Sequence, residues 1–151
     1  MARLPGSVLF ACNFNSIRSP MAAALLRQRH GRHIFVDSVG VRAMPIDPFA
    51  LTVMAEIGID LEGHMSKTFA ELEDTSFDLV ISLTPEAQHR AVELTRTMAC
   101  EVEFWPSFDP SSVEGSRAEI LAAFRSVRDA LARRIRARFP DLPPDRPVQG
   151  A

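Results

Sequence analysis

The residues best suited to chemistry lie close together near the start of the chain. Cys12 ends an apolar run, Arg18 follows six residues later, and Ser19 comes directly after it. A five-residue loop that enters a helix can turn backbone N–H groups inward, and these groups bind an oxyanion together with the helix dipole. The same positive field favours a thiolate, and an arginine can hold a tetrahedral oxyanion with a bidentate pair of hydrogen bonds. The spacing therefore predicts an oxyanion site beside a nucleophilic cysteine.

Stretches typical of strands and helices alternate along the chain and would position this loop. Asp47-Pro48 and Thr84-Pro85 each signal a helix start, because a capping residue is followed by proline. Such alternation predicts an α/β fold with a parallel sheet and helices on both faces. Ligands of these folds bind outside the carboxyl ends of the strands, which is where the Cys12 loop would lie. We expect strands at 7–11, 34–39, 77–83 and 102–105, helices at 20–28, 47–58 and 84–98, a short helix at 66–72, and a long helix that follows a capping box at 116–119 and extends through residue 135.

The composition excludes several other classes of protein. Of the 151 residues, 46% are hydrophobic and 24% are charged, which is the make-up of an ordinary globular protein. A net charge of −2 provides no basic field for nucleic acid. No apolar run approaches the ~20 residues that span a bilayer, so no membrane partner is expected. The two cysteines, Cys12 and Cys100, cannot form a disulfide framework, and a cytoplasmic location is therefore the expectation.

The histidines and the prolines give two further expectations. The histidines at 30, 33, 64 and 89 lack the spacing of metal ligands, so we expect no metal and no cofactor. From residue 140 onward the chain has four prolines within eight residues, which predicts an extended or loose tail. We therefore expect a single domain over residues 1–139 and a Pro-rich tail over residues 140–151.

The sequence resembles the low-molecular-weight protein tyrosine phosphatases and the related thioredoxin-coupled arsenate reductases. The resemblance extends over residues 7–138 and rests first on the loop CNFNSIRS at 12–19 and on the later pair Asp109-Pro110. Three more stretches are similar, namely DSVG at 37–40, DPFALTVMAEIGIDLEGH at 47–64 and FDLVISL at 77–83. Together with the alternating pattern, the resemblance implies a flavodoxin-like, three-layer fold whose four-stranded parallel sheet has the order 2-1-3-4.

The resemblance also implies a role for each residue of the motif. Cys12 would be the nucleophile that takes the phosphoryl group, and Arg18 would clamp the phosphate. Asp109 would protonate the leaving oxygen and then activate water against the cysteinyl-phosphate. Residues expected to bind phosphate are Asn13, Phe14, Asn15, Ser16, Ile17, Arg18 and Ser19, and those expected to support the loop are Asn15, Ser19, Ser38 and His64. The expected partner is a phosphorylated protein or a small aryl phosphate, with phosphate, sulfate or arsenate as bound oxyanions.

Departures from the family pattern keep other functions open. Phe14 stands where the family often has glycine, Ser111-Ser112 follow the late aspartate where tyrosines are common, and the chain has no tyrosine. Phosphatase chemistry is therefore better supported than a preference for phosphotyrosine. Arsenate reduction would need an external thiol, because the stretch at 82–94 that follows the third strand lacks the cysteines of the reductases and Cys100 is expected to be inert. The remaining alternative is a non-catalytic domain that binds an oxyanion or a partner.

Overall fold

A computed structural model describes residues 4–73 and 76–142 of the chain. Four strands, β1 (Ser7–Cys12), β2 (Phe35–Gly40), β3 (Leu79–Ser82) and β4 (Glu101–Phe104), form one parallel sheet in the order β2-β1-β3-β4. The predicted sheet and its order are thus confirmed. The predicted tail lies outside the described residues from position 143 onward.

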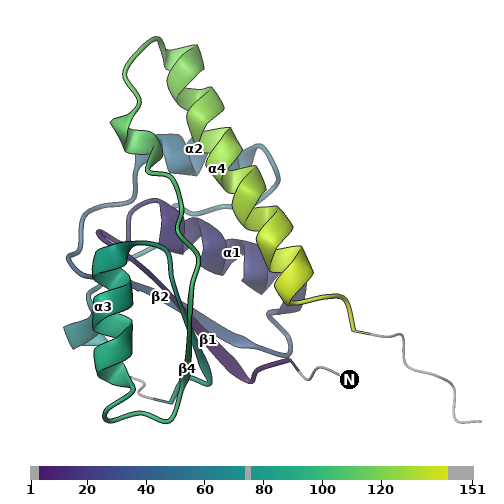
Figure 1. Cartoon of the computed structure of the whole chain (residues 1–151). Helices are drawn as coiled ribbons and strands as arrows, with labels where there is room; N and C mark the ends of the chain where they lie inside the picture. The colour runs from purple at the N-terminus through teal and green to yellow at the C-terminus, as the bar shows by residue number, and fades with distance from the viewer. Residues whose placement is uncertain (1–3, 74–75, 143–151) are drawn as a thin grey trace, which may run out of the picture.

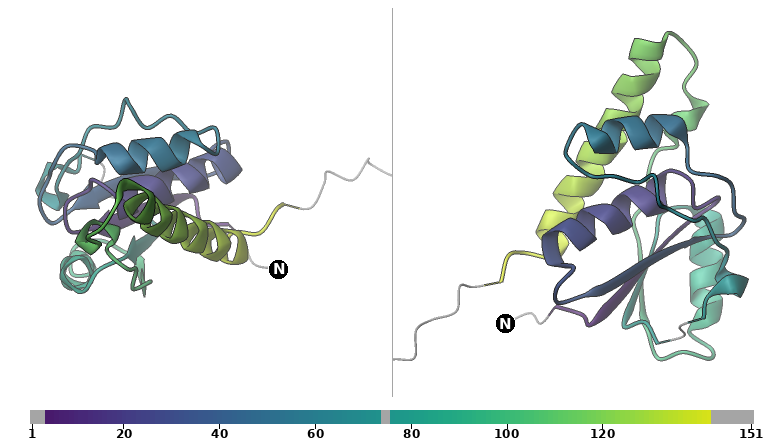
Figure 2. Two further views of the ribbon diagram at one scale, coloured as in Figure 1. Left: turned by 90° about the horizontal axis from the view of Figure 1, so that it is seen from above. Right: turned by 180° about the vertical axis from the view of Figure 1, so that it is seen from behind.

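Helices cover both faces of this sheet, as predicted (Figure 1). Successive residues of β1 point to opposite faces. Val8 and Phe10 pack into the core formed with α1 (Arg18–His30), α2 (Pro48–Ala55) and α4 (Arg117–Arg138), whereas Leu9 and Ala11 pack into the core formed with α3 (Pro85–Leu94). Figure 2 shows α1, α2 and α4 together on one side and α3 on the other. No helix in the described ranges is long and apolar enough to cross a membrane.

The helix starts follow the capping signals of the sequence. The Asp47 side chain accepts a hydrogen bond from the N–H of Phe49, and the Thr84 side chain accepts one from the N–H of Ala87. Ser116 caps α4 in the predicted capping box. The first helix begins at Arg18 rather than at residue 20, because proline is tolerated within the first turn, where its missing N–H costs nothing. The helix predicted at 66–72 is a single 3₁₀ turn, η1 (Phe69–Glu71).

The register of the strands brings the candidate residues to one edge. Cys12 at the end of β1 pairs with Gly40 at the end of β2, and Ala11 pairs with Ser82 at the end of β3. Ser82 in turn pairs with Phe104 at the end of β4. The loops that follow all four strands therefore emerge at the same edge, and the segment after β4 can reach the loop after β1.

Candidate functional site

The carbonyl groups of the loop between β1 and α1 accept hydrogen bonds from a neighbouring segment of the chain. The segment at 41–47 runs beside it, and four of its amides donate to carbonyls of Cys12, Asn13, Phe14 and Ser16 at 2.8–3.0 Å. Within the described residues, the amides at 14–17 donate no hydrogen bond to the protein. With the carbonyls turned outward, these N–H groups are available to an oxyanion, and the N-terminus of α1 adds positive partial charge.

Ser19 connects the cysteine to the buried loop asparagine. Its Oγ lies 2.9 Å from the Sγ of Cys12, accepts a hydrogen bond from Nδ2 of Asn15 at 2.8 Å and lies 3.2 Å from the carbonyl oxygen of Val39. A hydroxyl has one proton, so Ser19 donates either to Val39 or to the sulfur. Rotation of this hydroxyl toward Cys12 would stabilise a thiolate.

Asn15 holds the loop against the rest of the protein. It is fully buried and, among the described residues, is the only non-glycine with positive φ, at 52°. Its Nδ2 also donates to Ser38 Oγ at 2.9 Å, and its Oδ1 accepts from the N–H of Lys67 at 3.0 Å. Its carbonyl oxygen lies 3.0 Å from Nε2 of His64 and accepts from Ser66 Oγ at 2.8 Å. The predicted supports Ser38 and His64 thus both contact Asn15.

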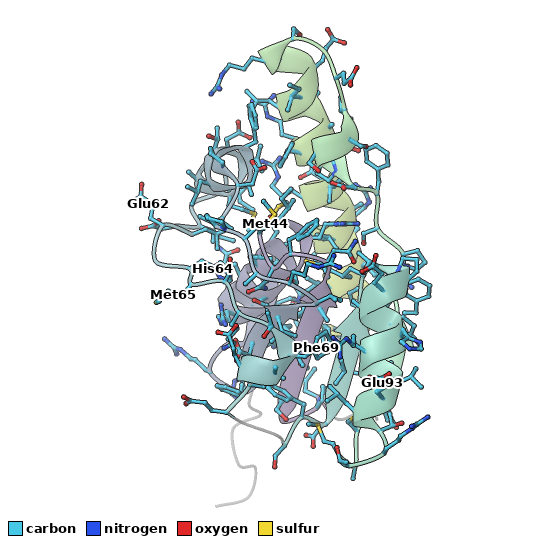
Figure 3. The ribbon with its side chains drawn as sticks, turned by 90° about the vertical axis from the view of Figure 1, so that its left-hand side faces the viewer. Met44, Glu62, His64, Met65, Phe69 and Glu93 are labelled. Atoms are coloured by element: carbon cyan, nitrogen blue, oxygen red, sulfur yellow. The ribbon has the colours of Figure 1, made fainter. Side chains whose placement is uncertain are left out.

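Burial lowers the pKa of His64 below its ordinary value, and the hydrogen bond to Asn15 opposes this only in part. A neutral imidazole has one N–H, and the neighbouring carbonyl requires that this proton be on Nε2. Figure 3 shows His64 and Met65 in one segment, on the same side of the molecule as Met44. His64 therefore braces the loop as an uncharged donor.

Arg18, at the end of the loop, and Asp109, after β4, lie close together at the site. The Arg18 side chain is 9% exposed, its Nη1 donates to the carbonyl oxygen of Ser107 at 2.9 Å, and its Nη2 lies 4.0 Å from Oδ2 of Asp109. Oδ1 of Asp109 accepts from the N–H and the Oγ of Ser111 at 2.9 and 2.6 Å. Ser111 thus orients the carboxylate through Oδ1, and Oδ2 faces Arg18.

These side chains meet in one pocket of about 230 Å³. Cys12 is 2% exposed within it, whereas Asp109 is 43% exposed at its mouth. An oxyanion in this pocket would have a thiol behind it, a guanidinium beside it and a carboxyl group toward solvent. The pocket is lined by Cys12, Phe14, Ser16, Ile17, Arg18, Met44, Asp47, Asp109 and Ser111.

Several contacts of the site have no signal in the sequence. Thr84 donates from Oγ1 to Oδ1 of Asn13 at 2.7 Å, so the cap of α3 also holds the loop. Ser107 and Lys67 contact site residues through backbone atoms, and the residue type gives no indication of such contacts. Gly40 ends the DSVG stretch, and a Cβ there would lie 2.6 Å from the Asn15 amide nitrogen, a closeness that depends on how the loop packs. In the described ranges, no group of three or more potential metal ligands occurs.

Cys100 lies far from the pocket, at the amino-terminal edge of the sheet. The next residue, Glu101, pairs with Leu79 of β3, and Leu79 pairs with Val8 near the start of β1. Cys12 lies at the other end of β1. At ~3.3 Å per residue, the two cysteines are separated by about 16 Å along the strands. A disulfide needs Cα atoms within ~7 Å, so these two residues cannot form one in this fold. Burial raises the pKa of the Cys100 thiol.

Comparisons with known proteins agree with this arrangement. Residues 7–144 match the family described as low molecular weight phosphotyrosine protein phosphatase. An arsenate reductase of Halalkalibacterium halodurans is 33% identical over 129 residues, which cover 85% of this chain and 91% of that protein. Among solved structures, an arsenate reductase in the phosphate-binding state is 28% identical with a TM-score of 0.67 and covers 87% of this chain and 94% of its own.

A further solved structure is that of the arginine phosphatase YwlE, as a cysteine-to-serine mutant with a phosphorylated active-site serine. It is 25% identical, has a TM-score of 0.68 and covers 86% of this chain and 91% of its own. The Cys12–Arg18 loop, the parallel sheet and the match over residues 7–144 lead to one conclusion. The chain belongs to the low-molecular-weight phosphotyrosine protein phosphatase family.

Proposed function

We propose that the protein is a cysteine-dependent phosphatase that hydrolyses phosphate monoesters through a cysteinyl-phosphate. The observation that carries this proposal is the convergence of Cys12, Arg18 and Asp109 on one small pocket. Membership of the family supports the class of chemistry. The phosphorylated serine that replaces the cysteine in the arginine phosphatase structure supports phosphoryl transfer to this position.

In the first step, the Cys12 thiolate attacks phosphorus and the bond from phosphorus to the leaving oxygen breaks. The loop amides and Arg18 bind the non-bridging oxygens, where charge must be held through the transition state. Asp109 delivers a proton to the leaving oxygen, so the alcohol or phenol departs neutral. Because Ser111 orients Oδ1, the proton is carried on Oδ2, the oxygen that faces Arg18.

In the second step, water attacks the phosphorus of the cysteinyl-phosphate and the S–P bond breaks. Asp109, now a carboxylate, accepts a proton from this water, and inorganic phosphate is released. The departing sulfur regains its negative charge within hydrogen-bonding distance of Ser19. The hydroxyl of Ser19 can turn from Val39 to the sulfur at this point, so it eases departure of the thiolate.

The rim of the pocket suits an aryl phosphate, including phosphotyrosine. Phe14, Ile17 and Met44 line it with apolar surface, and Met44 is half exposed. A volume of about 230 Å³ accommodates a phosphoryl group with one ring. The backbone of Phe14 does not have positive φ. Phe14 therefore adds an aromatic wall at no cost in backbone strain.

A second candidate substrate is phosphoarginine, which the carboxylates of the pocket favour. Asp47 and Asp109 both line it, together with Ser16. A guanidinium in the leaving group would pair with these carboxylates. The similarity to an arginine phosphatase supports this candidate.

Arsenate reduction is disfavoured, although curated relatives carry that name. Arsenate has the shape of phosphate and would fit the same loop. A disulfide between Cys12 and the distant Cys100 cannot serve as an electron relay, because the strands hold the two apart. Reduction would therefore depend on an external thiol.

The decisive experiment offers an aryl phosphate, phosphoarginine, and arsenate with a small thiol to three purified proteins. We expect wild type and Cys100→Ser to release phosphate from one of the first two substrates, and Cys12→Ser to release none. Arsenate reduction without phosphate release would instead identify a thiol-dependent reductase. No turnover, with phosphate still bound, would identify a binding domain.

A further inference from the structure

A second cavity lies on the far side of the segment that carries the candidate acid. Its volume is about 240 Å³, and it opens between residues 105–108 and α4. Figure 1 shows this segment running beside α4 toward η2 (Pro110–Ser112). None of the residues that line this cavity also lines the pocket that holds Cys12 and Arg18. The cavity is therefore a separate candidate ligand site.

The floor of this cavity is an aromatic ring in a fixed position. Trp105 is 3% exposed and contacts Phe10 and Phe139 edge-on or tilted, with centroids 6.1 and 6.5 Å apart. Its Nε1 donates to Glu103 at 3.1 Å. Leu131 and the exposed Phe108 add apolar walls. These walls suit a planar ring, and a cavity below the ~300 Å³ of drug-sized sites suits a small one.

The mouth of the cavity carries a positive charge. The guanidinium of Arg134 lies 5.0 Å above the centre of the Trp105 ring. On the same helix, Arg125, Arg128 and Arg138 each pair with a carboxylate. Arg134 forms no ion pair with any residue in the described ranges. Its charge is thus available to an anion that enters beside the ring.

Ser107 links this cavity to the phosphate loop. It lines the cavity, while its carbonyl oxygen accepts the hydrogen bond from Arg18 at 2.9 Å. Its neighbour Phe108 precedes Asp109, whose carboxylate lies 4.0 Å from the same arginine. A ligand that contacts Ser107 and Phe108 would therefore change the positions of Arg18 and Asp109, the two side chains beside the proposed oxyanion.

We propose that the cavity at Trp105 binds a small planar aromatic carboxylate and that its occupancy is coupled to oxyanion binding through Ser107 and Arg18. The ring of the ligand lies against Phe108 and Leu131 beside the edge of Trp105, and its carboxylate pairs with Arg134. Coupling is reciprocal, so phosphate in the loop must change the affinity of the cavity for the carboxylate by the same factor as the reverse.

Benzoate is a suitable probe, and Trp105 is its reporter, since it is the only tryptophan in a chain without tyrosine. Benzoate should change the Trp105 emission saturably, whereas benzyl alcohol and acetate, which lack the charge or the ring, should bind at least about tenfold more weakly. Arg134→Gln should weaken benzoate binding about tenfold, while the matched change Arg133→Gln, one residue away and outside the cavity, should not. Ala130→Leu fills the cavity from the helix surface and should abolish binding without touching the core.

Phosphate distinguishes coupling from competition. In the proposed arrangement, added phosphate shifts the dissociation constant of benzoate by about fivefold or more, and the shift reaches a limit when the loop is full. A shift that grows without limit would place benzoate in the phosphate loop and overturn the proposal. Equal affinities of the Arg134→Gln and Arg133→Gln proteins, or no effect of phosphate, would overturn it too. None of these readouts depends on catalysis, so they stand apart from the test of the phosphatase.

Discussion

Asn15 takes the backbone conformation that the loop requires and also anchors the loop. Phe14 stands where the family often has glycine, and left-handed dihedrals there would cost a non-glycine residue ~1–2 kcal/mol. The positive φ falls on Asn15 instead, and asparagine tolerates it better than most residues. Its side chain and carbonyl bond to Ser19, Ser38, His64 and Lys67. Phe14 is therefore free to contribute its ring to the rim.

At the residue scale, Asp109 gives the sharpest catalytic prediction. Asp109→Asn should slow hydrolysis of phenyl phosphate, a poor leaving group, by ~10²–10⁴-fold, because the departing oxygen loses its proton donor. Hydrolysis of 4-nitrophenyl phosphate, which needs little protonation, should slow much less. Steady-state rates on the two substrates measure the contrast. Equal losses on both substrates, or none, would show that the acid is another residue.

His64 predicts a pH dependence of stability. Its folded pKa is lowered by burial, so below the ordinary value of 6.5 the unfolded chain binds more protons than the folded one. The free energy of unfolding should therefore be highest above pH 6.5 and fall as the pH decreases from there toward the folded pKa. His64→Gln keeps a donor for Asn15 but cannot titrate, so this part of the decline should disappear.

Urea denaturation at about pH 7.5 and 5.5 measures the effect. His33→Gln changes an exposed residue on the loop after α1. This variant should lose as much free energy of unfolding between the two pH values as wild type does. If the His64→Gln protein loses as much stability as wild type between these pH values, burial of the neutral ring is not the cause.

At the scale of elements, the close approach of β2 to the loop after β1 sets the geometry of the site. Gly40 ends β2, and its amide donates to the carbonyl oxygen of Lys67 at 2.8 Å. A Cβ at Gly40 would lie 2.3 Å from the carbonyl oxygen of Arg42 and 2.8 Å from the carbonyl carbon of Phe14. The contacted atoms are all backbone, so the loop or the segment beside it must move to admit a side chain.

Gly40→Ala should therefore reduce kcat/KM by up to ~10²-fold, the effect expected for catalytic groups displaced by about 1 Å. Phosphate affinity should fall along with it, since the loop amides move together. Gly63→Ala is the matched control, because a Cβ there meets no atom within 4 Å. Similar kinetics for the two variants would mean that the loop adapts to the added methyl group.

At the scale of the whole molecule, a charge cluster joins α2 to the long helix α4. Glu56 follows α2 and accepts hydrogen bonds from Arg125 and Arg128, and Arg128 is buried and also donates to the carbonyl oxygen of Val53. The hydrogen bond from Arg125 is the largest cause that holds the pKa of Glu56 at about 2, below its ordinary value of 4.5. The cluster ties α4 to the end of α2 within the layer that these helices share with α1.

This cluster predicts part of the acid unfolding of the protein. Because the folded pKa of Glu56 is depressed, its contribution to stability is present above pH 4.5 and is lost as the pH falls toward 2. Glu56→Gln should lower the thermal midpoint at neutral pH, since the buried guanidinium of Arg128 keeps Asp129 but loses the other of its two carboxylate partners, and should flatten the decline below pH 4.5. Circular dichroism melts across this range test it, with the exposed Glu62→Gln as control. A variant that melts like wild type at neutral pH would contradict the role of the cluster.

The sequence by itself determined the features that neighbouring residues encode. Caps followed by proline started α2 and α3 where predicted, and the alternation of strands and helices gave the parallel sheet. The Cys12–Arg18 spacing predicted a loop between a strand and a helix, and the structure has one between β1 and α1. Helix ends were predicted less well, as for the helix expected at 84–98 that ends at Leu94, because no strong stop signal competes with tertiary packing there.

Only the tertiary structure decided which distant segments meet. The hydrogen bonds of Asn15 to the segment at 64–67, of Thr84 to Asn13 and of Arg18 to the Ser107 carbonyl depend on strand register and on how loops pack at the sheet edge. Two of these contacts have a backbone group as one partner, the N–H of Lys67 and the carbonyl of Ser107, and every residue type except proline has both groups. The cavity beneath Arg134 likewise exists because α4 packs against the segment after β4. Local sequence encodes short-range geometry, whereas such contacts arise from the packing of the whole chain.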